Sequence, residues 1–469
     1  MFDINEAVKD REGYIDPVIF TDEDLYRQEM SKIFRKTWLY VGHESSVPSP
    51  GSYILNYMGD EEVIVIRDPN SRLRVFLNRC PHRGNKLCLF DQGTQKGFTC
   101  SFHGWNFDTE GRLRGVADRD AYADTLKAER LGLKEVPRVS SYGGLIFASW
   151  DEHISSLDDY LGDIRWYLDR LLLKEFLGGI EVLPGRGKYL MPTNWKMMAD
   201  NFMHDGTHVP ITHTSFFRAV QEMMKTQGIG WFGGNLFDSA LNVLTTSPTG
   251  VPHGCGFFEF LGDIRPDSSA QVQPMLDRRM AERLGPEAVD WLNERTKRME
   301  SLAKEDKSMV LGSANWTIFP NLSFIMSPSA MRANGIIQWH PRGPQMLEGW
   351  QWTVVEKDAP DVVKRFAAGL LAADQSPAGM ITIDDTENFD RMARNFGTST
   401  AEERPFDYSM PGVDKQKFLQ KFNQAGIDIG SLPGSLEPLF TEETARAYYG
   451  YYRKLMNESN SIGAEENIA

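Results

Sequence analysis

Two kinds of hydrophobic pattern divide the chain. Between residues 38 and 150, short runs in which apolar and polar residues alternate are separated by turn sequences, which is typical of β-strands. Residues 62–67 and 73–78 flank a turn sequence at residues 68–71 and predict a hairpin. Residues 143–150 have the continuous apolar character of a buried strand. This segment is therefore expected to be a small all-β domain.

Beyond about residue 158 the pattern mixes helical and strand spacing. Strands are expected at residues 336–339 and 350–355. Helices are expected at residues 157–176, 275–307 and 441–456. A further helix, capped by residues 358–360, is expected to run to about residue 373. The helical stretch 275–307 is polar and reads mostly as a solvent-facing surface. The larger part of the chain is therefore expected to be α+β.

Composition places the chain among globular proteins, with 41% hydrophobic and 25% charged residues. Its 469 residues exceed the usual size of one hydrophobic core, so we expect two domains or a small domain inserted in a larger one. The net charge of −14 opposes binding to nucleic acid and to anionic membranes. The first residues lack the order of a signal peptide, and no apolar run is long enough to span a membrane. A cytoplasmic protein that binds neither nucleic acid nor membrane is expected.

Cysteine and histidine are scarce and clustered. The four cysteines are too few for a disulfide framework in so long a chain. Cys80 and His82 form one pair, and Cys100 and His103 form a second pair after seventeen intervening residues. Such a set can bind zinc or an iron–sulfur cluster. Zinc sites usually open with two nearby cysteines, so one Cys and one His from each loop better fits a [2Fe–2S] cluster. Cys88 falls outside this pattern and is expected to be a buried structural thiol.

The residues around these pairs carry a resemblance to a known family. Residues 80–85 read Cys-Pro-His-Arg-Gly-Asn, and residues 100–105 read Cys-Ser-Phe-His-Gly-Trp. The glycine in each run allows the backbone to approach a cluster closely. The two runs resemble the Rieske motif of aromatic-ring-hydroxylating dioxygenases. The resemblance implies a [2Fe–2S] cluster bound by Cys80, His82, Cys100 and His103.

A second group of histidines consists of His204, His208 and His213. Two imidazoles with one distant carboxylate form the ligand set of non-haem Fe(II) sites that activate oxygen. His204 and His208 would share one helical face, since they are four residues apart. In a regular helix His208 and His213 would point about 140° apart, so they need a break, which Pro210 can supply. Geometry alone leaves both pairs open and favours the first.

The stretch from Asn201 to His213 is similar to the iron-binding pattern of the same family. The resemblance implies that His208 and His213 bind iron, and that His204 lies outside the ligand set. Residues 381–389 resemble the family's late acidic segment, which implies Asp385 as the third ligand. Asp384 is the alternative.

Asp205 lies three residues before His208 and could accept the second ring N–H of that histidine. In the family, the matching aspartate also hydrogen-bonds a cluster histidine of the neighbouring subunit. The resemblance therefore implies that Asp205 links the two metal centres and that His103 is its partner.

Three weaker signals remain. Residues 228–233 match the letters of a dinucleotide-binding motif, but no convincing strand precedes them and aromatic residues occupy the turn, so we interpret the match as coincidence. Without a nucleotide fold, reducing equivalents must come from another protein. Residues 250–258, which include His253, and Gln375 are expected to line a pocket.

The resemblance covers nearly the whole chain and implies its architecture. An all-β Rieske [2Fe–2S] domain at residues 38–157 is inserted in a larger helix-grip catalytic domain, an antiparallel sheet with helices, formed by residues 1–37 and 158–469. Each subunit carries one cluster and one mononuclear Fe(II). The implied assembly is a homotrimer, or an alpha3beta3 hexamer with small beta subunits. A ring of head-to-tail contacts can place each cluster beside a neighbour's iron.

The resemblance also implies an activity. The chain would be a terminal oxygenase component that receives electrons from NAD(P)H through a ferredoxin, a reductase or both. It would use O2 to cis-dihydroxylate an aromatic ring, giving a cis-dihydrodiol. A Rieske monooxygenase or an O- or N-demethylase with the same two metal centres is one alternative. A zinc-binding protein without enzymatic activity is another.

Overall fold

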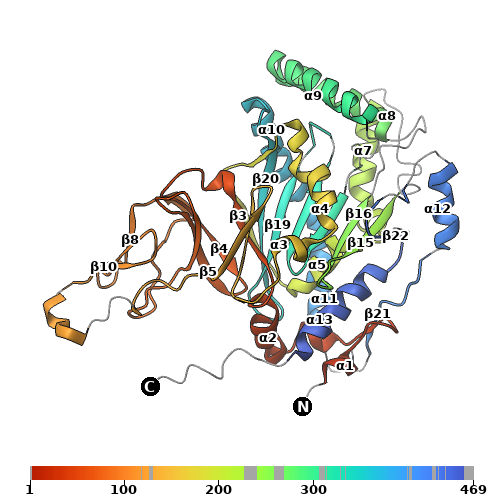
Figure 1. The fold of residues 1–469 in the computed structure, drawn as a ribbon. Helices are drawn as coiled ribbons and strands as arrows, with labels where there is room; N and C mark the ends of the chain where they lie inside the picture. Colours follow the sequence, from red (N-terminus) through yellow and green to blue (C-terminus); the bar gives the residue numbers. More distant parts are fainter. Residues whose placement is uncertain are drawn as a thin grey trace. The chain divides into compact units, whose positions relative to one another are not determined.

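The structure is a computed structural model that divides the chain into two compact units (Figure 1). One unit is Glu29–Asp158, and the other combines Met1–Gln28 with Asp159–Ala469, so the first is inserted in the sequence of the second. The structure describes residues 3–458 except 118, 126–129, 227–239, 258–268, 306–311, 313, 328, 333, 399, 401–403, 413, 425–428, 431 and 439. Within these residues, no helix combines the length and the apolar character that a membrane crossing requires.

The smaller unit consists of antiparallel β-sheets. Its sheets are β6 (Leu73–Leu77), β5 (Glu61–Arg67), β4 (Ser52–Met58) and β7 (Gln92–Thr94); β10 (Leu113–Gly115), β9 (Asn106–Asp108) and β8 (Gly97–Thr99); and β11 (Arg138–Tyr142), β12 (Leu145–Ser149) and β3 (Leu39–His43). The predicted hairpin is confirmed, since β5 pairs with β6 in the register Val65 to Val75. The predicted buried strand is β12, whose residues are all buried.

The turn of this hairpin depends on one buried carboxylate. Asp68 accepts hydrogen bonds from the backbone N–H groups of Asn70 and Arg72 and from Nε of Arg74. Burial alone would raise the pKa of Asp68, but these donors outweigh it and lower the pKa. The ionised carboxylate therefore fixes the turn, and with it the register of the two strands.

The core of the smaller unit includes the loops that carry the predicted cluster ligands. Cys80, Cys100 and Trp105 belong to the same buried cluster of side chains as Ile64 and Phe107 of the strands. A loop anchored in a packed core keeps its geometry, because displacing it would open a cavity. The sheets therefore hold both loops in fixed positions.

The larger unit is built on one antiparallel sheet. Its strand order is β13 (Ile180–Val182), β20 (Leu347–Glu356), β19 (Gly335–Pro341), β18 (Leu322–Met326), β17 (Ala314–Ile318), β16 (Pro252–Phe257), β15 (Leu241–Thr246) and β22 (Ser435–Pro438), with β14 (Gly187–Met191) also paired to β20. The predicted strand pair is confirmed as β19 with β20. A separate small sheet joins β1 (Val8–Lys9), β2 (Tyr14–Ile15) and β21 (Phe406–Asp407).

Helices pack against this sheet, so the predicted α+β class is confirmed. The helices are α1 (Ile4–Ala7), α2 (Glu23–Glu29), α3 (Leu157–Leu161), α4 (Ile164–Tyr167), α5 (Trp195–His204), α6 (Val209–Thr212), α7 (Thr214–Thr226), α8 (Ser269–Leu284), α9 (Pro286–Glu305), α10 (Asp361–Gln375), α11 (Thr382–Phe396), α12 (Lys415–Gln424) and α13 (Glu443–Asn457). The helix predicted at 275–307 is instead two helices, because Gly285 adopts a positive φ of 111° between α8 and α9.

Helix α5 packs across β16 to β19, and α13 packs beside it (Figure 1). Gly254 in β16 makes the close approach of α5 possible. A Cβ atom at this position would lie 2.5 Å from the carbonyl oxygen of Met203, near the end of α5. Only glycine leaves room for the backbone of the helix there.

A buried carboxylate joins α5 to the C-terminal helix. Asp200 of α5 accepts hydrogen bonds from the hydroxyl of Tyr408 at 3.0 Å and from the hydroxyl of Tyr449 at 3.1 Å. Asp200 is only 5% exposed. Burial and the Asp200 charge together raise the pKa of both tyrosines, so both hydroxyls remain donors. The last turns of α5 are therefore fixed by residues distant in the sequence.

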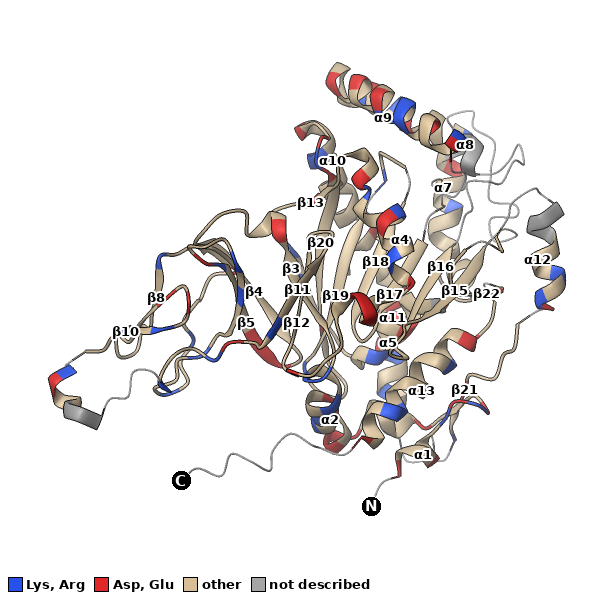
Figure 2. Cartoon of the chain, viewed as in Figure 1, with Lys and Arg blue, Asp and Glu red and all other residues tan. Residues whose placement is uncertain are grey.

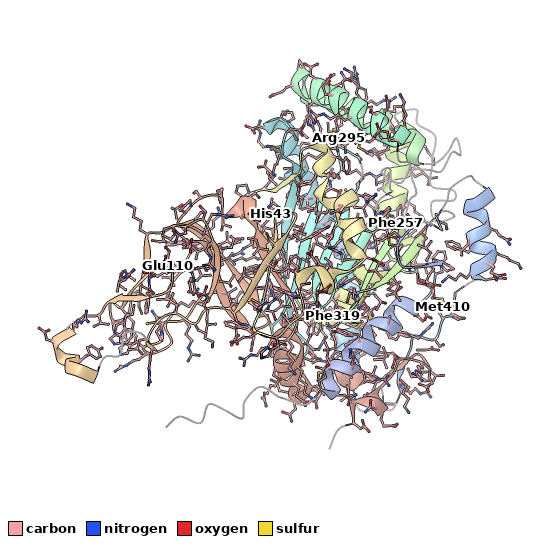
Figure 3. All side chains as sticks on the ribbon, in the orientation of Figure 1. His43, Glu110, Phe257, Arg295, Phe319 and Met410 are labelled. Carbon is pink, nitrogen blue, oxygen red and sulfur yellow. The ribbon has the colours of Figure 1, made fainter. Side chains whose placement is uncertain are left out.

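Helix α9 carries acidic and basic side chains along its length (Figure 2). One of them faces inward: Arg295, labelled in Figure 3, is 9% exposed. Its guanidinium donates to both carboxylate oxygens of Glu356 on β20 at 2.9–3.0 Å. Nζ of Lys174 lies 3.6 Å from the same carboxylate. This buried ion cluster connects α9 to the sheet.

Candidate functional site

The two loops that contain the predicted cluster ligands have the same backbone hydrogen bonds. In the first loop the N–H of Gly84 donates to the carbonyl of Cys80 at 2.9 Å, and in the second the N–H of Gly104 donates to that of Cys100 at 2.9 Å. The N–H of each cysteine donates to the carbonyl five residues later at 2.8 Å. Both glycines have positive φ, 77° and 68°, which is why each turn requires a glycine.

The side chains of all four predicted ligands come together between these loops. The thiols of Cys80 and Cys100 lie close enough for each to shift the pKa of the other, and both cysteines are almost fully buried. The ring centroids of His82 and His103 lie 4.6 Å apart at an angle of 73°. The ring of His82 also stacks on Trp105, with the centroids 4.7 Å apart. One side of the site therefore presents sulfur and the other presents imidazole nitrogen.

Hydrogen-bond donors surround the sulfur atoms. Burial raises the pKa of the Cys80 thiol. Burial acts in the same direction on Cys100, but the backbone N–H groups of Phe102 and His103 and the amide of Asn85 lower the pKa of that thiol overall. The Asn85 amide nitrogen lies 3.7 Å from Sγ of Cys100.

A ring nitrogen of one predicted ligand is buried without a partner. Nδ1 of His82 has no hydrogen-bond partner among the residues that the structure describes. A buried polar atom without a partner is unusual unless it contacts a ligand. Two thiols, two imidazoles and an unpartnered ring nitrogen fit a [2Fe–2S] cluster.

Cys88 stays outside this site. Its backbone is held by the side chain of Asn78, which accepts from the Cys88 N–H at 2.9 Å and donates to the Cys88 carbonyl at 2.9 Å. Burial raises the pKa of its thiol to about 12. A thiol that remains protonated is a poor metal ligand, as expected for a structural cysteine.

A second cluster of potential metal ligands lies in the larger unit. One ligand atom from each of His208, His213 and Asp385 lies within 4.8 Å of the other two. Nε2 of His208 is 3.7 Å and Nε2 of His213 is 3.4 Å from Oδ1 of Asp385. The two rings lie 5.3 Å apart at an angle of 75°. Two imidazoles and one carboxylate converging on one point fit a non-haem iron(II) ion.

The two histidines occupy opposite ends of the short helix α6. His208 precedes its first residue and His213 follows its last. Pro210 sits in the first turn, where a missing N–H costs nothing. The prediction that Pro210 breaks a helix between the two histidines is therefore wrong. The break comes earlier, because α5 already ends at His204 and Asp205 caps it.

The rival pairing of His204 with His208 required one continuous helix. Because α5 ends at His204, the two histidines do not share a helical face. The side chain of His204 lies outside the described residues. Within the part of the chain that the structure describes, the metal-ligand group contains His208, His213 and Asp385.

Each histidine of this group also has a carboxylate beside its other ring nitrogen. Oδ2 of Asp205 lies 3.3 Å from Nδ1 of His208, and Oδ2 of Asp384 lies 3.5 Å from Nδ1 of His213. Oδ1 of Asp205 accepts the backbone N–H groups of Thr207 and His208, which fixes the loop between α5 and α6. Asp384 therefore lies on the outer side of His213, whereas Asp385 lies on the inner side.

Burial controls the charge state of the three inner groups. It raises the pKa of Asp385 to about 7, assisted by the charges of Asp205 and Asp384 and opposed by His208. Burial and the nearby His208 lower the pKa of His213 to about 4. Burial would also lower the pKa of His208, but Asp205 outweighs it and raises that pKa. A buried carboxylate that resists ionisation favours a cation beside it, as a bound metal ion would provide.

The predicted pocket residues have other roles in the structure. The loop expected at residues 250–258 is instead strand β16 over Pro252–Phe257. Nδ1 of His253 accepts the N–H of Phe319, and its Nε2 lies 2.9 Å from the carbonyl of Tyr160, so His253 is a satisfied core residue. Gln375 accepts a hydrogen bond from the hydroxyl of Thr382, which secures the start of α11. Residues 228–233 lie outside the described residues.

Sequence reasoning did not find two further residues of these sites. The charge of Asp385 contributes to raising the pKa of Tyr189, after burial, so this tyrosine lies close to the metal-ligand group. Asn85 contacts the sulfur of Cys100 from the other loop. Neither residue type signals such a role by itself. The only signal in the sequence was that Asn85 ends the run of residues 80–85, directly after Gly84, and so lies close to the predicted ligands.

Comparison with known protein families assigns both parts of the chain. The Rieske [2Fe-2S] domain matches residues 37–136, and the ring hydroxylating alpha subunit (catalytic domain) matches residues 157–457. The chain belongs to the ring-hydroxylating dioxygenase alpha subunits. The predicted family is therefore confirmed, and with it the membership of an oxidoreductase family that carries a Rieske domain. The Rieske match also favours an iron–sulfur cluster over zinc at the Cys–His pairs.

Relatives of this alpha subunit extend over nearly its full length. It is 34% identical to the biphenyl 2,3-dioxygenase subunit alpha of Rhodococcus jostii, over 97% of this chain and 91% of that protein. It is also 34% identical to a benzene 1,2-dioxygenase subunit alpha of Pseudomonas putida, over 97% of this chain and 93% of that protein. The structure of naphthalene 1,2-dioxygenase with indole bound in the active site aligns with a TM-score of 0.78 and 28% identity, covering 98% and 96% of the two chains.

Proposed function

We propose that this alpha subunit is the terminal oxygenase that cis-dihydroxylates an aromatic ring, using O2 and electrons from NAD(P)H. The observation that carries the proposal is the presence of two different metal-ligand sets in one chain. A Rieske domain contains two Cys–His pairs, and the catalytic domain contains the converging group of His208, His213 and Asp385. When bound, a Rieske cluster supplies single electrons, and a ferrous ion with open coordination positions supplies the activation of dioxygen.

Separate sets of residues bind the cluster and the mononuclear iron ion. Cys80, His82, Cys100 and His103 hold the cluster. His208, His213 and Asp385 would hold one iron ion through two imidazoles and one carboxylate, a ligand set that leaves coordination positions open for dioxygen. The low pKa of His213 keeps its ring neutral near pH 7, the form that binds a metal.

Asp205 is the proposed connection between the centres. Its carboxylate lies 3.3 Å from Nδ1 of His208, and its side chain is 37% exposed, so another subunit can reach it. We propose that His103 of a neighbouring subunit donates a hydrogen bond to Asp205. A path of that kind links the two imidazoles by one carboxylate.

Exposed apolar side chains around both sites support a ring of subunits. In the smaller unit Leu89, Phe90 and Phe102, which flank the cluster loops, are 67%, 74% and 60% exposed. In the larger unit Ile211 of α6 is 72% exposed, and Ile383 beside Asp384 is 50% exposed. Such side chains at a functional site favour burial against a partner. We propose a head-to-tail trimer, with beta subunits, in which the two sets meet between neighbours.

A neutral aromatic ring is the proposed substrate. The charges that shift the pKa values of His208, His213 and Asp385 come from carboxylates and histidines, chiefly Asp205 and Asp384. An aromatic carboxylate would meet like charges at this site. The relatives are named for biphenyl and benzene, which are uncharged. Electrons are proposed to arrive through a ferredoxin, a reductase or both.

Two substitutions separate the centres. Cys80→Ser should bleach the red-brown cluster, whereas the matched control Cys88→Ser should keep the colour because Cys88 lies outside the site. His208→Ala should keep the colour and the cluster's electron-paramagnetic signal but lose turnover. Loss of colour in the His208 variant, or retained colour in the Cys80 variant, would contradict this division.

Product analysis tests the reaction. The purified oxygenase with its electron partners should convert benzene or biphenyl into a cis-dihydrodiol that contains two oxygen atoms from the same O2 molecule. A product with one oxygen atom from O2, or a demethylated product, would instead establish a Rieske monooxygenase or demethylase.

Complementation tests the trimer. Cys80→Ser and His208→Ala subunits, each inactive alone, should regain part of the activity when they are produced together, because an intact cluster can then serve a neighbour's intact iron site. Activity that stays absent in mixed assemblies of proven composition would exclude transfer between subunits.

A further inference from the structure

The two histidines of the catalytic metal site have matching surroundings. Both direct Nε2 toward Asp385, at 3.7 Å for His208 and 3.4 Å for His213. Both have a carboxylate oxygen near Nδ1, from Asp205 at 3.3 Å and from Asp384 at 3.5 Å. Asp205 already has a proposed role between the centres, but Asp384 has none.

His213 needs an acceptor at Nδ1. The His213 side chain is 5% exposed, and its buried Nδ1 has no hydrogen-bond partner within the described part of the chain. If Nε2 binds a metal ion, Nδ1 carries the ring proton and acts as a hydrogen-bond donor. A buried N–H without an acceptor is destabilising, because the hydrogen bond that it made to water in the unfolded chain is not replaced. The carboxylate of Asp384 lies 3.5 Å from this nitrogen.

The same oxygen of Asp384 has a second contact. The hydroxyl of Ser215 on α7 donates to Oδ2 of Asp384 at 3.4 Å. Asp384 and Asp385 are consecutive in α11, where successive side chains point about 100° apart. They therefore face different sides of His213: Asp385 faces Nε2 and Asp384 faces Nδ1. One helix thus supplies both a ligand and the residue that orients a ligand.

We propose that Asp384 is a positioning residue that accepts the Nδ1 proton of His213, fixes the orientation of that ring and adds negative charge beside the iron. This inference rests on the proposed function, because it assumes that His213 binds iron. A carboxylate behind a metal-bound imidazole makes the ring a stronger donor to the metal. The added negative charge also stabilises the ferric ion more than the ferrous ion.

Three variants test this role. Asp384→Ala removes the acceptor, and Asp384→Asn keeps the shape while it removes the charge. Glu387→Gln is the matched control, since Glu387 lies on the same helix but is 59% exposed and pairs with Arg391. The measurements are iron retained against a chelator, the electron-paramagnetic spectrum of the ferrous nitric oxide adduct, and the midpoint potential of the mononuclear iron. The absorbance of the Rieske cluster reports whether each variant is folded.

Asp384→Ala should weaken iron binding 10- to 100-fold, which is the usual effect of removing such a partner. Asp384→Asn should lose less of its affinity for iron, because the amide oxygen can still accept a hydrogen bond from Nδ1 of His213. Both variants should raise the midpoint potential and alter the nitric oxide spectrum, and Glu387→Gln should change neither. Unchanged iron affinity, spectrum and potential in folded Asp384→Ala would overturn the proposal.

One further variant separates this proposal from the proposed function. His213→Ala should lose the iron whatever Asp384 does. If His213→Ala keeps its iron and its spectrum, the assignment of the iron site itself fails. If His213→Ala loses iron while both Asp384 variants match the wild type, only the role of Asp384 fails.

Discussion

Removing the buried carboxylate of Glu356 should destabilise the catalytic domain strongly. Arg295 and Glu356 are 9% and 7% exposed and share three hydrogen bonds of 2.9–3.0 Å. Lys174, also buried, lies 3.6 Å from the same carboxylate. Glu356→Gln would leave two buried cations without their anion. Breaking such a pair costs about 3–5 kcal/mol in the free energy of unfolding.

Thermal unfolding measures this effect. With an unfolding entropy of about 2.1 cal/mol/K per residue, the loss corresponds to a decrease in Tm of roughly 4–7 °C for a unit as large as this one. Tryptophan fluorescence reports chiefly the catalytic domain, because eight of the eleven tryptophans lie in the larger unit. The absorbance of the cluster follows the Rieske domain. Glu294→Gln is the matched control, since Glu294 lies next to Arg295 on α9. It pairs with Lys297 on the solvent-exposed side, and exposed pairs contribute little to stability.

The effect should also depend on pH. Burial would raise the pKa of Glu356, but Arg295 and Lys174 outweigh it and lower the pKa below the ordinary value of 4.5. The stabilisation is therefore fully present above pH 4.5 and is lost as the pH falls through the lower pKa of the folded protein. The difference in Tm between the wild type and Glu356→Gln should be largest near pH 7 and should shrink below pH 4.5. A variant that matches Glu294→Gln at pH 7, or a difference that grows toward low pH, would refute the reasoning.

Three further substitutions test other parts of the structure. Tyr449→Phe removes one of the two hydroxyls that donate to buried Asp200, so the free energy of unfolding should fall by about 1.5–3 kcal/mol in a thermal or denaturant titration. Gly254→Ala places a methyl group against the backbone of α5, so the protein should lose about 1–3 kcal/mol of stability together with part of its bound iron, measured by metal analysis. Asn85→Ala removes the amide beside Sγ of Cys100, and a redox titration should give a lower midpoint potential for the cluster, because that hydrogen bond stabilises the more negative reduced form. Unchanged values would contradict the contact in question.

Local geometry explains why the two Cys–His pairs could be located in the sequence. Cys80 and His82 lie in one tight turn, and Cys100 and His103 lie in another, so spacing within each loop determines what the loop can present. The strand pairs around short turns were predictable for the same reason, since alternation and turn residues act over a few positions.

Contacts between distant segments explain what could not be predicted. The loop between α5 and α6 begins where Asp205 caps the end of α5. The position of α5 depends on Gly254, because a larger residue there would keep the helix away from the sheet. The sequence predicted a helix break at Pro210, because a proline can be recognised in a sequence. The end of α5 at His204 is fixed by packing and could not be recognised in the same way. His253 looked like a pocket residue, because its partners Tyr160 and Phe319 lie far away in the sequence.

The sequence by itself determined the family, the α+β class and the Cys–His pairs, because each of these depends on motifs or periodicities within short stretches. The tertiary structure alone decided how the acidic segment is used. It brought α11 beside α6, which set Asp385 against Nε2 and Asp384 against Nδ1 of His213. Two adjacent aspartates look alike in a sequence, and only the face that each presents to a distant helix decides which ring nitrogen of His213 it approaches.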